Sequence, residues 1–418
     1  MNLEYFIARR LITARNRKSS ISAPIMKIAV WAIAIGMIMM ILSVATGIGL
    51  QRKIREKVAA FNGQIIITNL DDNESDVSVK PVSIHQKFYP VFKEIPEITH
   101  VQAVASKAGI IRTADAFEGV IFKGVGSDYR WDNLKEYLVS GRLPNLKGTL
   151  NDEVIISEYL ANRLNLRVGS RFNTFFMKDD GAVRKPNLRV FQIVGIYNSG
   201  FQEFDAQFIL GDIRHLQRIN KWKPDQVGAF ELFVDDFSKL DEIGDKVYKT
   251  TFNAQNPAET LDSRTIAEKY GYIFEWLKLF DFNIIVILVV MILVATINMV
   301  VALLVLILER TRFIGTLKSL GANNWTVRKI FLYNAGYLIL RGLFWGNAIG
   351  ILLIVIQQQF GIVKLNPENY YVTTAPVYFD FGYIFLLNFG TSIICLIVLL
   401  IPSIIISRIS PVKAIRFD

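Results

Sequence analysis

The sequence predicts a membrane protein with four transmembrane α-helices and one large α+β extracytoplasmic domain inserted between the first and second helix. Its 418 residues have a mean hydropathy of +0.33, which is too apolar for an ordinary soluble enzyme. Four long apolar runs are separated by polar segments, and the longest of these segments has about 225 residues. A segment of that length is enough for one large or two small soluble domains.

Each apolar run is long enough to cross a bilayer, which takes roughly 20 residues of α-helix. Residues 28–50, 282–308 and 381–407 carry no charged side chain, and residues 330–363 carry only Arg341. The first run is too long for a cleavable signal, and no small-residue cleavage site follows it. We therefore expect transmembrane helices at 28–50, 276–308, 330–356 and 381–407.

The distribution of charge predicts the orientation of the chain. Residues 1–27, 309–329 and 407–418 together hold 14 basic and 3 acidic side chains, whereas residues 51–275 hold 30 basic and 31 acidic ones. Because Lys- and Arg-rich loops stay in the cytoplasm, both termini, including the tail at 408–418, are expected there. The large domain and a short loop at 357–380 then face outward. The large domain has no basic excess with which to attract nucleic acid.

The elements follow in order. Residues 1–27 predict an amphipathic helix on the cytoplasmic membrane surface, with a solvated topology signal as the alternative. Residues 51–62 continue the first transmembrane helix to Gly63, and residues 263–283 are expected to run as helix into the second. Between them we expect an acidic loop at 71–76, helices within 83–96, 153–166, 212–222 and 239–252, and strands within 64–68, 99–126, 153–166, 167–177, 188–200 and 228–236.

The usual signatures of catalysis and metal binding are absent from the sequence. It contains no phosphate-binding P-loop, no H-E-x-x-H and no G-x-S-x-G motif. His85, His100 and His215 lie far apart, and the acidic loop at 71–76 lacks the Gly and Glu of a calcium loop. The single cysteine, Cys395, falls inside the fourth span, which leaves none for a disulfide in the large domain. We therefore expect a non-catalytic chain without a cofactor or metal of its own.

The segment at 309–329 predicts a short amphipathic helix on the cytoplasmic side. On a helix, Phe313, Leu317, Leu320 and Trp325 share one face, and the basic residues Arg310, Lys318 and Arg328 point elsewhere. Gly321 is placed to end this helix at the C′ position. A rigid connector of this kind can be gripped by another protein, whereas the simpler alternative is a positively charged loop.

The motif "ERTRFIGTLKSLGA", Glu309 to Ala322, resembles the coupling segment of the FtsX/MacB-type ABC transporter permeases, E-[RK]-x-R-E-I-x-x-L-[RK]-x-[LM]-G-A, and departs from it at Phe313. The ending "SRISPVKAIRFD" is similar to the closing P-x-x-A-[IL]-R of that family. The runs "FIARRLITARNRKSSIS…GLQRKIREKV" and "EVIISEYLANRLNLRVGS…FQIVGIYNSGFQEFDAQFIL" look like the lipoprotein-releasing, Lol-type branch.

This resemblance implies an inner-membrane subunit that pairs with a second permease chain, alike or different, and with two copies of a cytoplasmic ATPase that binds ATP and Mg²⁺. ATP hydrolysis would then drive release of a lipoprotein from the membrane lipid to a soluble periplasmic carrier, by mechanical coupling to the periplasmic domain. The implied ATPase-coupling residues are Glu309, Arg310, Arg312, Ile314, Gly315, Leu317, Lys318, Gly321 and Ala322.

A polar turn between two expected strands predicts a protruding hairpin, because common hairpin loops have only about 2–5 residues. In Lol-type permeases the equivalent hairpin is a hook for the carrier. This likeness rests on the position of the turn before "FQIVGIY". Phe176 and Met177, at the base of the hairpin, are expected to form an apolar anchor for the carrier. An idle mobile loop is the alternative. The implied carrier-binding residues are Phe176, Met177, Lys178, Arg184, Lys185 and Pro186.

Two polar residues lie within expected spans. Arg341 is expected either to take part in a permease interface or to snorkel toward the membrane surface. Asn298 is expected either to hydrogen-bond a neighbouring helix or to point into the bundle. Two other functions compete with lipoprotein release: a MacB-like efflux or export permease, and a membrane sensor with a periplasmic ligand-binding domain.

Overall fold

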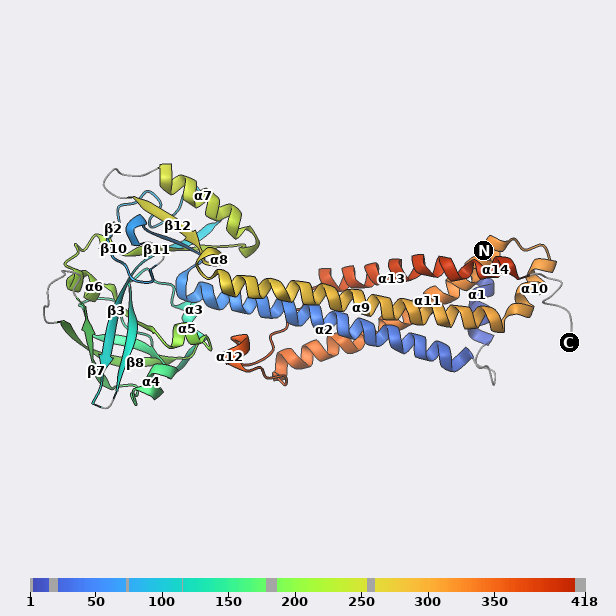
Figure 1. Ribbon diagram of the computed structural model, residues 1–418, viewed down its shortest axis with the longest axis horizontal. Coiled ribbons are helices and arrows are strands. Elements are labelled where there is room, and N and C mark those ends of the chain that lie inside the picture. The colour runs from blue at the N-terminus through green and yellow to red at the C-terminus, as the bar shows by residue number, and fades with distance from the viewer. Residues whose placement is uncertain are drawn as a thin grey trace. The chain divides into compact units, whose positions relative to one another are not determined.

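The computed structural model describes residues 3–14, 22–72, 75–114, 116–177, 186–253 and 260–409 (Figure 1). The chain divides into two compact units, and each is described by itself. The helical unit comprises Met1–Gln51, Leu277–Lys364 and Thr374–Asp418. The sheet unit comprises Arg52–Trp276 and Leu365–Thr373.

The helical unit is built from long apolar helices and short connectors. Within the described residues its helices are α1 (Leu3–Ala14), α2 (Ser22–Asn62), α9 (Gly271–Glu309), α10 (Thr311–Ser319), α11 (Asn324–Phe360), α13 (Phe381–Ser403) and α14 (Ile405–Arg408). Four stretches have the length and composition to cross a membrane: Pro24–Asn62, Gly271–Glu309, Asn324–Phe360 and Phe381–Ser407. The predicted fold class of four membrane helices with an α+β domain between the first and second is confirmed.

A stripe of glycines brings α11 close to α2. A Cβ added to Gly342 would lie 2.8 Å from Ile33 Cβ, and one added to Gly346 would lie 2.7 Å from Met37 Cβ. Gly350, one turn further along α11, makes the next contact with α2. Small residues at this spacing let two helix backbones approach closely, so packing rather than polarity holds this pair together.

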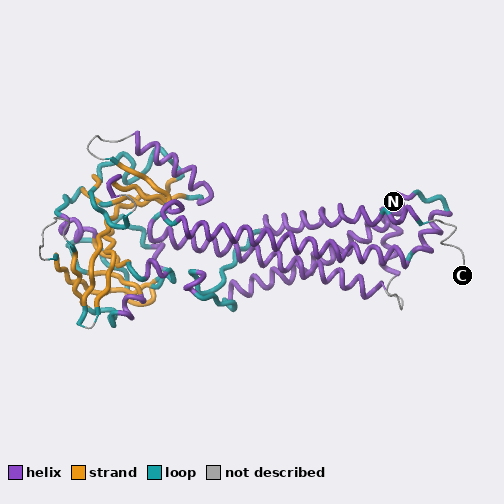
Figure 2. Tube along the Cα trace, viewed as in Figure 1, coloured by secondary structure: helices purple, strands orange, loops and turns teal. Residues whose placement is uncertain are grey.

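The sheet unit contains the strands of the described chain, drawn in orange in Figure 2. They are β1 (Ile65–Asn69), β2 (Val82–Ser83), β3 (Ile98–Arg112), β4 (Phe117–Val125), β5 (Leu138–Gly141), β6 (Glu153–Ser157), β7 (Arg171–Phe176), β8 (Asn187–Tyr197), β9 (Phe208–Asp212), β10 (Gln226–Val227), β11 (Ala229–Val234) and β12 (Leu261–Thr265). Its other helices are η1 (Leu70–Asp72), α3 (Asp132–Lys135), α4 (Glu158–Arg163), α5 (Gln202–Asp205), α6 (Ile213–Asn220), η2 (Phe237–Lys239), α7 (Leu240–Asn253), α8 (Ile266–Lys269) and α12 (Pro367–Tyr370).

The main sheet closes partly on itself. Its strands follow the order β12-β1-β11-β3-β4-β9-β6-β8-β5, and β7 pairs with both β3 and β8. Strands β3, β4, β9, β6, β8 and β7 therefore form a ring. The ring interior holds Phe122, Phe176 and Phe191, all buried, and the Phe122 and Phe191 ring centroids lie 4.9 Å apart. Strand β3 pairs with β11 through its first half and with β7 through its last residues.

Several local predictions are confirmed. Helix α2 ends at Asn62, and Gly63 follows with a positive φ of 65°. The hairpin of β3 and β4, the pairing of β7 with β8, and helices α4, α6 and α7 also occur where the sequence indicates. Of the N-terminal helix expected over residues 1–27, Leu3–Ala14 forms α1, and residues 22–27 belong to α2. Tyr5 of α1 contacts Tyr333 of α11 edge to face at 6.1 Å.

Two predicted helices are wrong. Residues 83–96 contain no helix, because Pro90 interrupts the pattern, and the Phe88 and Phe92 rings stack at 5.6 Å in an irregular segment. The continuous helix expected from Ser263 starts only at Gly271, since Leu261–Thr265 pairs with β1 as strand β12. Residues 261–265 are too few for the spacing of their apolar side chains to distinguish a strand from a helix.

The expected segment bounds also change. Helix α11 starts at Asn324, so residues 324–329 belong to it and not to the connector at 309–329. Helices α2, α9 and α11 exceed the predicted spans at one or both ends. Residues 365–373 of the expected outer loop at 357–380 belong to the sheet unit.

Candidate functional site

The connector between α9 and α11 consists of α10 and a glycine turn. Gly321 has a φ of +89° and follows the C-cap residue Leu320. Its N–H donates to Lys318 O at 3.0 Å, and the Ala322 N–H donates to Leu317 O at 3.0 Å. This pair of bonds is a Schellman motif, which satisfies two carbonyls at the helix end and fixes the direction of the exit. The prediction of Gly321 at the C′ position is confirmed.

Helix α10 buries a different face from the one expected. Ile314 is fully buried in the helical-unit core, and Leu317 and Ala322 pack against that core. Leu320 is 80% exposed and Trp325 is 49% exposed, so neither lies on the packed face. Of the other predicted coupling residues, Gly315 is buried, Arg310 is half-buried, and Glu309, Arg312 and Gly321 are exposed.

Lys318, one of the expected coupling residues, points toward the end of α14. Its Nζ donates to Ile406 O at 2.7 Å and to Ile409 O at 2.9 Å. Arg328 of α11 donates to the Ser407 hydroxyl. A cation at a helix C-terminus is favourable because it faces the free carbonyls, so these two residues tie the connector to the last described helix of the chain. Burial, followed by the charge of Arg328, lowers the pKa of Lys318.

The polar residues predicted within the spans make no contact across the bundle that the structure shows. Arg341 lies exposed on α11, and Asn298 donates to Val294 O of its own helix at 2.8 Å. A pair that the sequence analysis missed does cross between helices. Asn347 of α11 and Asn388 of α13 exchange hydrogen bonds at 2.7 and 2.9 Å. The residues around Asn347 and Asn388 in the sequence form no pattern that predicts this contact.

In the sheet unit, the last turns of α2 are held by a buried lysine. Lys57 donates to Tyr371 O at 2.8 Å and to Ser199 O. The Tyr371 ring stacks on Phe201 at 4.3 Å. The Ser199 hydroxyl donates to Asp205 at 2.7 Å, and burial raises the pKa of Asp205 against this hydrogen bond. The segment at 365–373 is therefore docked, and not the plain loop that the sequence suggested.

A second buried lysine braces the end of α2. Lys123 of β4 donates to Phe61 O in the last turn of α2 and forms an ion pair with Glu231 of β11. Gln102 of β3 donates to the other oxygen of Glu231 at 2.7 Å. Burial lowers the pKa of Lys123, and the Glu231 carboxylate opposes this shift. Both side chains are at most 4% exposed. Their charges are therefore stabilised by each other and by these hydrogen bonds, and not by water.

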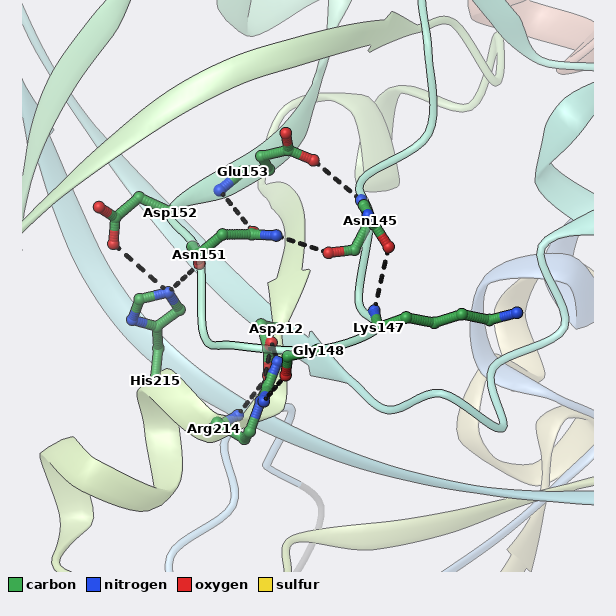
Figure 3. Close-up of polar contacts among 9 residues, drawn as sticks. All are labelled: Asn145, Lys147, Gly148, Asn151, Asp152, Glu153, Asp212, Arg214 and His215. Carbon is green, nitrogen blue, oxygen red and sulfur yellow. Dashed lines mark hydrogen bonds and ion pairs between the residues drawn. The ribbon is translucent and has the colours of Figure 1, made fainter.

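A further polar cluster braces the loop between β5 and β6. Figure 3 shows His215 of α6 pointing toward this loop, where its Nε2 lies 2.7 Å from Asn151 O and 3.7 Å from Asp152 Oδ1. Burial lowers the pKa of His215, which favours the neutral ring beside Asp152. Arg214 donates to Gly148 O at 2.7 Å. These groups bond to one another, which indicates a structural brace.

The predicted hairpin lies between β7 and β8, and its residues 178–185, including Lys178, Arg184 and Lys185, are outside the described residues. Phe176 is fully buried in the sheet ring, so the expectation that it anchors a partner is wrong. Met177 is 67% exposed. Pro186 lies at the hairpin base and lines a surface hollow with Phe117.

An apolar surface borders this hairpin. In the ladder, Ile110 of β3 lies opposite Phe175 of β7, which in turn lies opposite Leu188 of β8. Ile110 and Leu188 are more than 40% exposed, and Phe117 and Val190 add further exposed apolar area. We define these residues, with Met177, as the hairpin patch. Exposed contiguous apolar surface of this kind is typical of interaction sites.

Comparison with known proteins identifies the family. Residues 28–247 match the family described as the MacB-like periplasmic core domain, and residues 285–411 match the FtsX-like permease C-terminal family. The chain is 23% identical to the lipoprotein-releasing system transmembrane protein LolC of Neisseria meningitidis, over 100% of both chains. It is 21% identical to the corresponding LolE of Haemophilus influenzae, over 90% of both.

Among solved structures, the periplasmic region of MacB from Actinobacillus actinomycetemcomitans aligns with 51% of this chain and 92% of its own length. The sequence identity is 14% and the TM-score 0.35. The MacB-like family covers more than half of the chain, and the FtsX-like family covers the helices that follow. The chain therefore belongs to the FtsX/MacB superfamily of ABC transporter permeases, as a multi-pass membrane protein whose full-length relatives include Lol-type permeases.

Proposed function

We propose that this chain is the permease subunit of an inner-membrane ABC transporter that releases lipoproteins to a soluble periplasmic carrier. The observation that carries the proposal is the continuity of two helices: α2 and α9 each run unbroken and contribute residues to both units. A stiff helix transmits displacement, so motion of the membrane helices would reach the exported domain without chemistry in this chain. The full-length likeness to LolC and LolE supports lipoprotein as the cargo.

The assembly would contain two copies of an ATPase subunit and a second permease chain, identical or different. ATP and Mg²⁺ would bind to the ATPase, and both termini of this chain would lie in the cytoplasm, as the charge distribution indicates. The ATPase would dock on the exposed side of the connector, at Glu309, Arg312 and Gly321. The buried side, centred on Ile314, would carry the motion into the bundle.

Copurification from membranes tests the assembly. We expect an ATPase subunit to copurify with the chain, and the reconstituted complex to release a lipoprotein to its carrier only when ATP is present. An isolated chain with no ATPase would contradict the proposal and would favour a membrane sensor.

An efflux or export permease is the second candidate, because the MacB-like family covers residues 28–247. Depletion of the chain separates the two candidates. Lipoproteins retained in the inner membrane would support lipoprotein release, whereas normal lipoprotein sorting with an accumulated small molecule or peptide would support export.

Gly321→Val is expected to uncouple ATP hydrolysis from release. A Cβ at Gly321 meets no atom within 4 Å, so the effect comes from the positive φ alone. That strain costs about 1–3 kcal/mol, which corresponds to a roughly 5- to 150-fold loss of the native turn. ATPase binding should persist while release per ATP falls.

Gly336→Val is the matched control, because Gly336 also has open space for a Cβ and lies within helix α11. It should leave release unchanged. Normal release by Gly321→Val, with normal stimulation of the ATPase, would show that this turn has no part in coupling.

The hairpin and the hairpin patch are proposed to bind the carrier. Deletion of residues 179–185 should weaken carrier binding, and Met177→Asp combined with Leu188→Asp should weaken it by about tenfold or more, because burial of two apolar side chains is lost. The measurement is carrier affinity by surface plasmon resonance. Val139→Asp on β5 is the control, since Val139 is also an exposed strand residue. If all these variants bind the carrier with the affinity of the unaltered chain, the hairpin does not bind the carrier.

A further inference from the structure

The sheet unit contains a cavity of about 840 Å³ that neither the connector nor the hairpin uses. Its walls come from β1, β12, α5 and α7 and from the chain between α8 and the first residues of α9. Ligand sites in proteins commonly have volumes of roughly 300–1,000 Å³, so this space is large enough for an organic ligand.

Carboxylates dominate the polar lining of the cavity. Six acidic residues line it against two basic ones: Asp76, Glu203, Asp241, Asp245, Asp262 and Glu268 against Arg264 and Lys269. Three of the acids are engaged within the wall. Asp76 pairs with Lys269 at 2.6 Å, Asp262 pairs with Arg264 at 3.0 Å, and Glu268 accepts the Thr265 N–H at 2.8 Å.

The other three acids have no ion-pair partner among the residues that the structure describes: Glu203 on α5, and Asp241 and Asp245 on α7. Asp241 and Asp245 are one helical turn apart, an arrangement of like charges that destabilises a helix. Gly244 lies between them, and a Cβ there would be 2.6 Å from Thr265 Cγ2. This close seating of α7 on β12 sets the position of the helix, on which Asp241 and Asp245 are exposed residues of the cavity lining.

Two residues of the cavity lining have a buried polar atom without a hydrogen-bond partner among the described residues. Ser263 is 9% exposed, and its hydroxyl has no partner in the described part of the chain. The Oε2 atom of Glu203 is also buried and without a partner there. Buried polar atoms in native proteins are nearly always satisfied, so these two residues of the cavity lining carry hydrogen-bonding capacity that the described chain leaves unmet.

The arrangement of the acids favours an extended ligand over a single metal ion. Across the described residues, no three Asp, Glu, His or Cys side chains converge as metal ligands would, so the acids are spread along the cavity. Tyr248, Tyr270 and Tyr272 also line the cavity and provide aromatic surface, which suits alkyl chains and cationic heads. We propose that this cavity binds an extended organic polycation, with ammonium or guanidinium groups at Glu203 and at the Asp241–Asp245 pair.

Calorimetry on the full chain in phosphatidylcholine nanodiscs tests this site, because zwitterionic lipid does not itself attract polycations. The probes are spermidine, tri-lysine peptide, acetylated tri-lysine and Mg²⁺. We expect a polycation to bind, and Asp241→Asn with Asp245→Asn to weaken it by about tenfold or more through the loss of charged hydrogen bonds. Glu203→Gln should act in the same direction, and Ser263→Ala should weaken binding a few-fold.

Glu242→Gln is the matched control, because Glu242 is on the same helix, pairs with Lys246 at 2.9 Å and does not line the cavity. Binding of spermidine alone would assign the site to a free polyamine, and binding of tri-lysine alone to a basic peptide segment. The proposal is overturned if neither binds, if Mg²⁺ competes equally, or if Glu242→Gln weakens binding as much as the cavity variants. None of these outcomes depends on whether lipoproteins are the cargo.

Discussion

A flexible Gly-Ser insert between Gln51 and Arg52 is expected to abolish lipoprotein release while the chain still binds its ATPase. Helix α2 is unbroken from Ser22 to Asn62, and its residues pass from the helical to the sheet unit at this point. A random-coil linker bends freely and does not transmit displacement. The measurement is release of a lipoprotein to the carrier by the reconstituted complex, with ATPase activity recorded in parallel.

A helix-forming insert of the same length is the control. About seven residues rich in Ala, Glu and Lys make roughly two helical turns, so the stiffness and the facing of α2 are kept. This insert should retain a substantial part of the release activity. If the flexible insert also retains it, the exported domain is a passive scaffold. If both inserts abolish it, length rather than stiffness is the sensitive property.

Lys123→Met is expected to destabilise the sheet unit by about 3–5 kcal/mol, because Glu231 would remain buried without its cation. The same substitution removes the hydrogen bond to Phe61 O, which closes the last turn of α2. Amide hydrogen exchange of the full chain in detergent measures the effect. Protection in β4 and β11 should fall by a factor on the order of 10² to 10³.

Lys53→Met gives the matched comparison. Lys53 is on α2 and pairs with Glu136 at 3.1 Å, but both side chains are at least one-third exposed. Breaking an exposed pair costs at most about 1 kcal/mol, so protection should hardly change. The double variant Lys123→Met with Glu231→Leu should recover much of the loss, since an apolar pair can replace a buried ion pair. Equal effects at Lys53 and Lys123 would contradict the role given to burial.

The features that the sequence predicted correctly are those set by local chemistry. The four apolar runs determine the membrane helices, and Gly321 supplies the positive φ that a Schellman motif needs. The β3–β4 hairpin follows from two β-rich runs around a polar turn. The family could likewise be inferred, because its motifs are contiguous in the chain.

The predictions that were wrong or missing share a different cause: each concerns a residue whose structure is set by residues distant in the chain. Residues 261–265 are a strand only because β1 lies beside them, and Phe176 is buried only because the sheet closes into a ring. Lys57 meets a carbonyl more than 300 residues away, at Tyr371. The contact of Lys318 with the carbonyls of α14 was missed, because nothing in a helical projection reveals them.

The hydrogen-bonded amides of Asn347 and Asn388 constrain how this sequence can evolve. Replacing either one alone leaves the other amide without its partner in an apolar bundle, at a cost averaging about 0.6 kcal/mol for such membrane contacts and reaching roughly 1.7. A change of both residues to leucine removes the penalty, but the path passes through a less stable intermediate. Descendants of this chain should therefore keep both asparagines or lose both, so the two positions should covary although they are 41 residues apart.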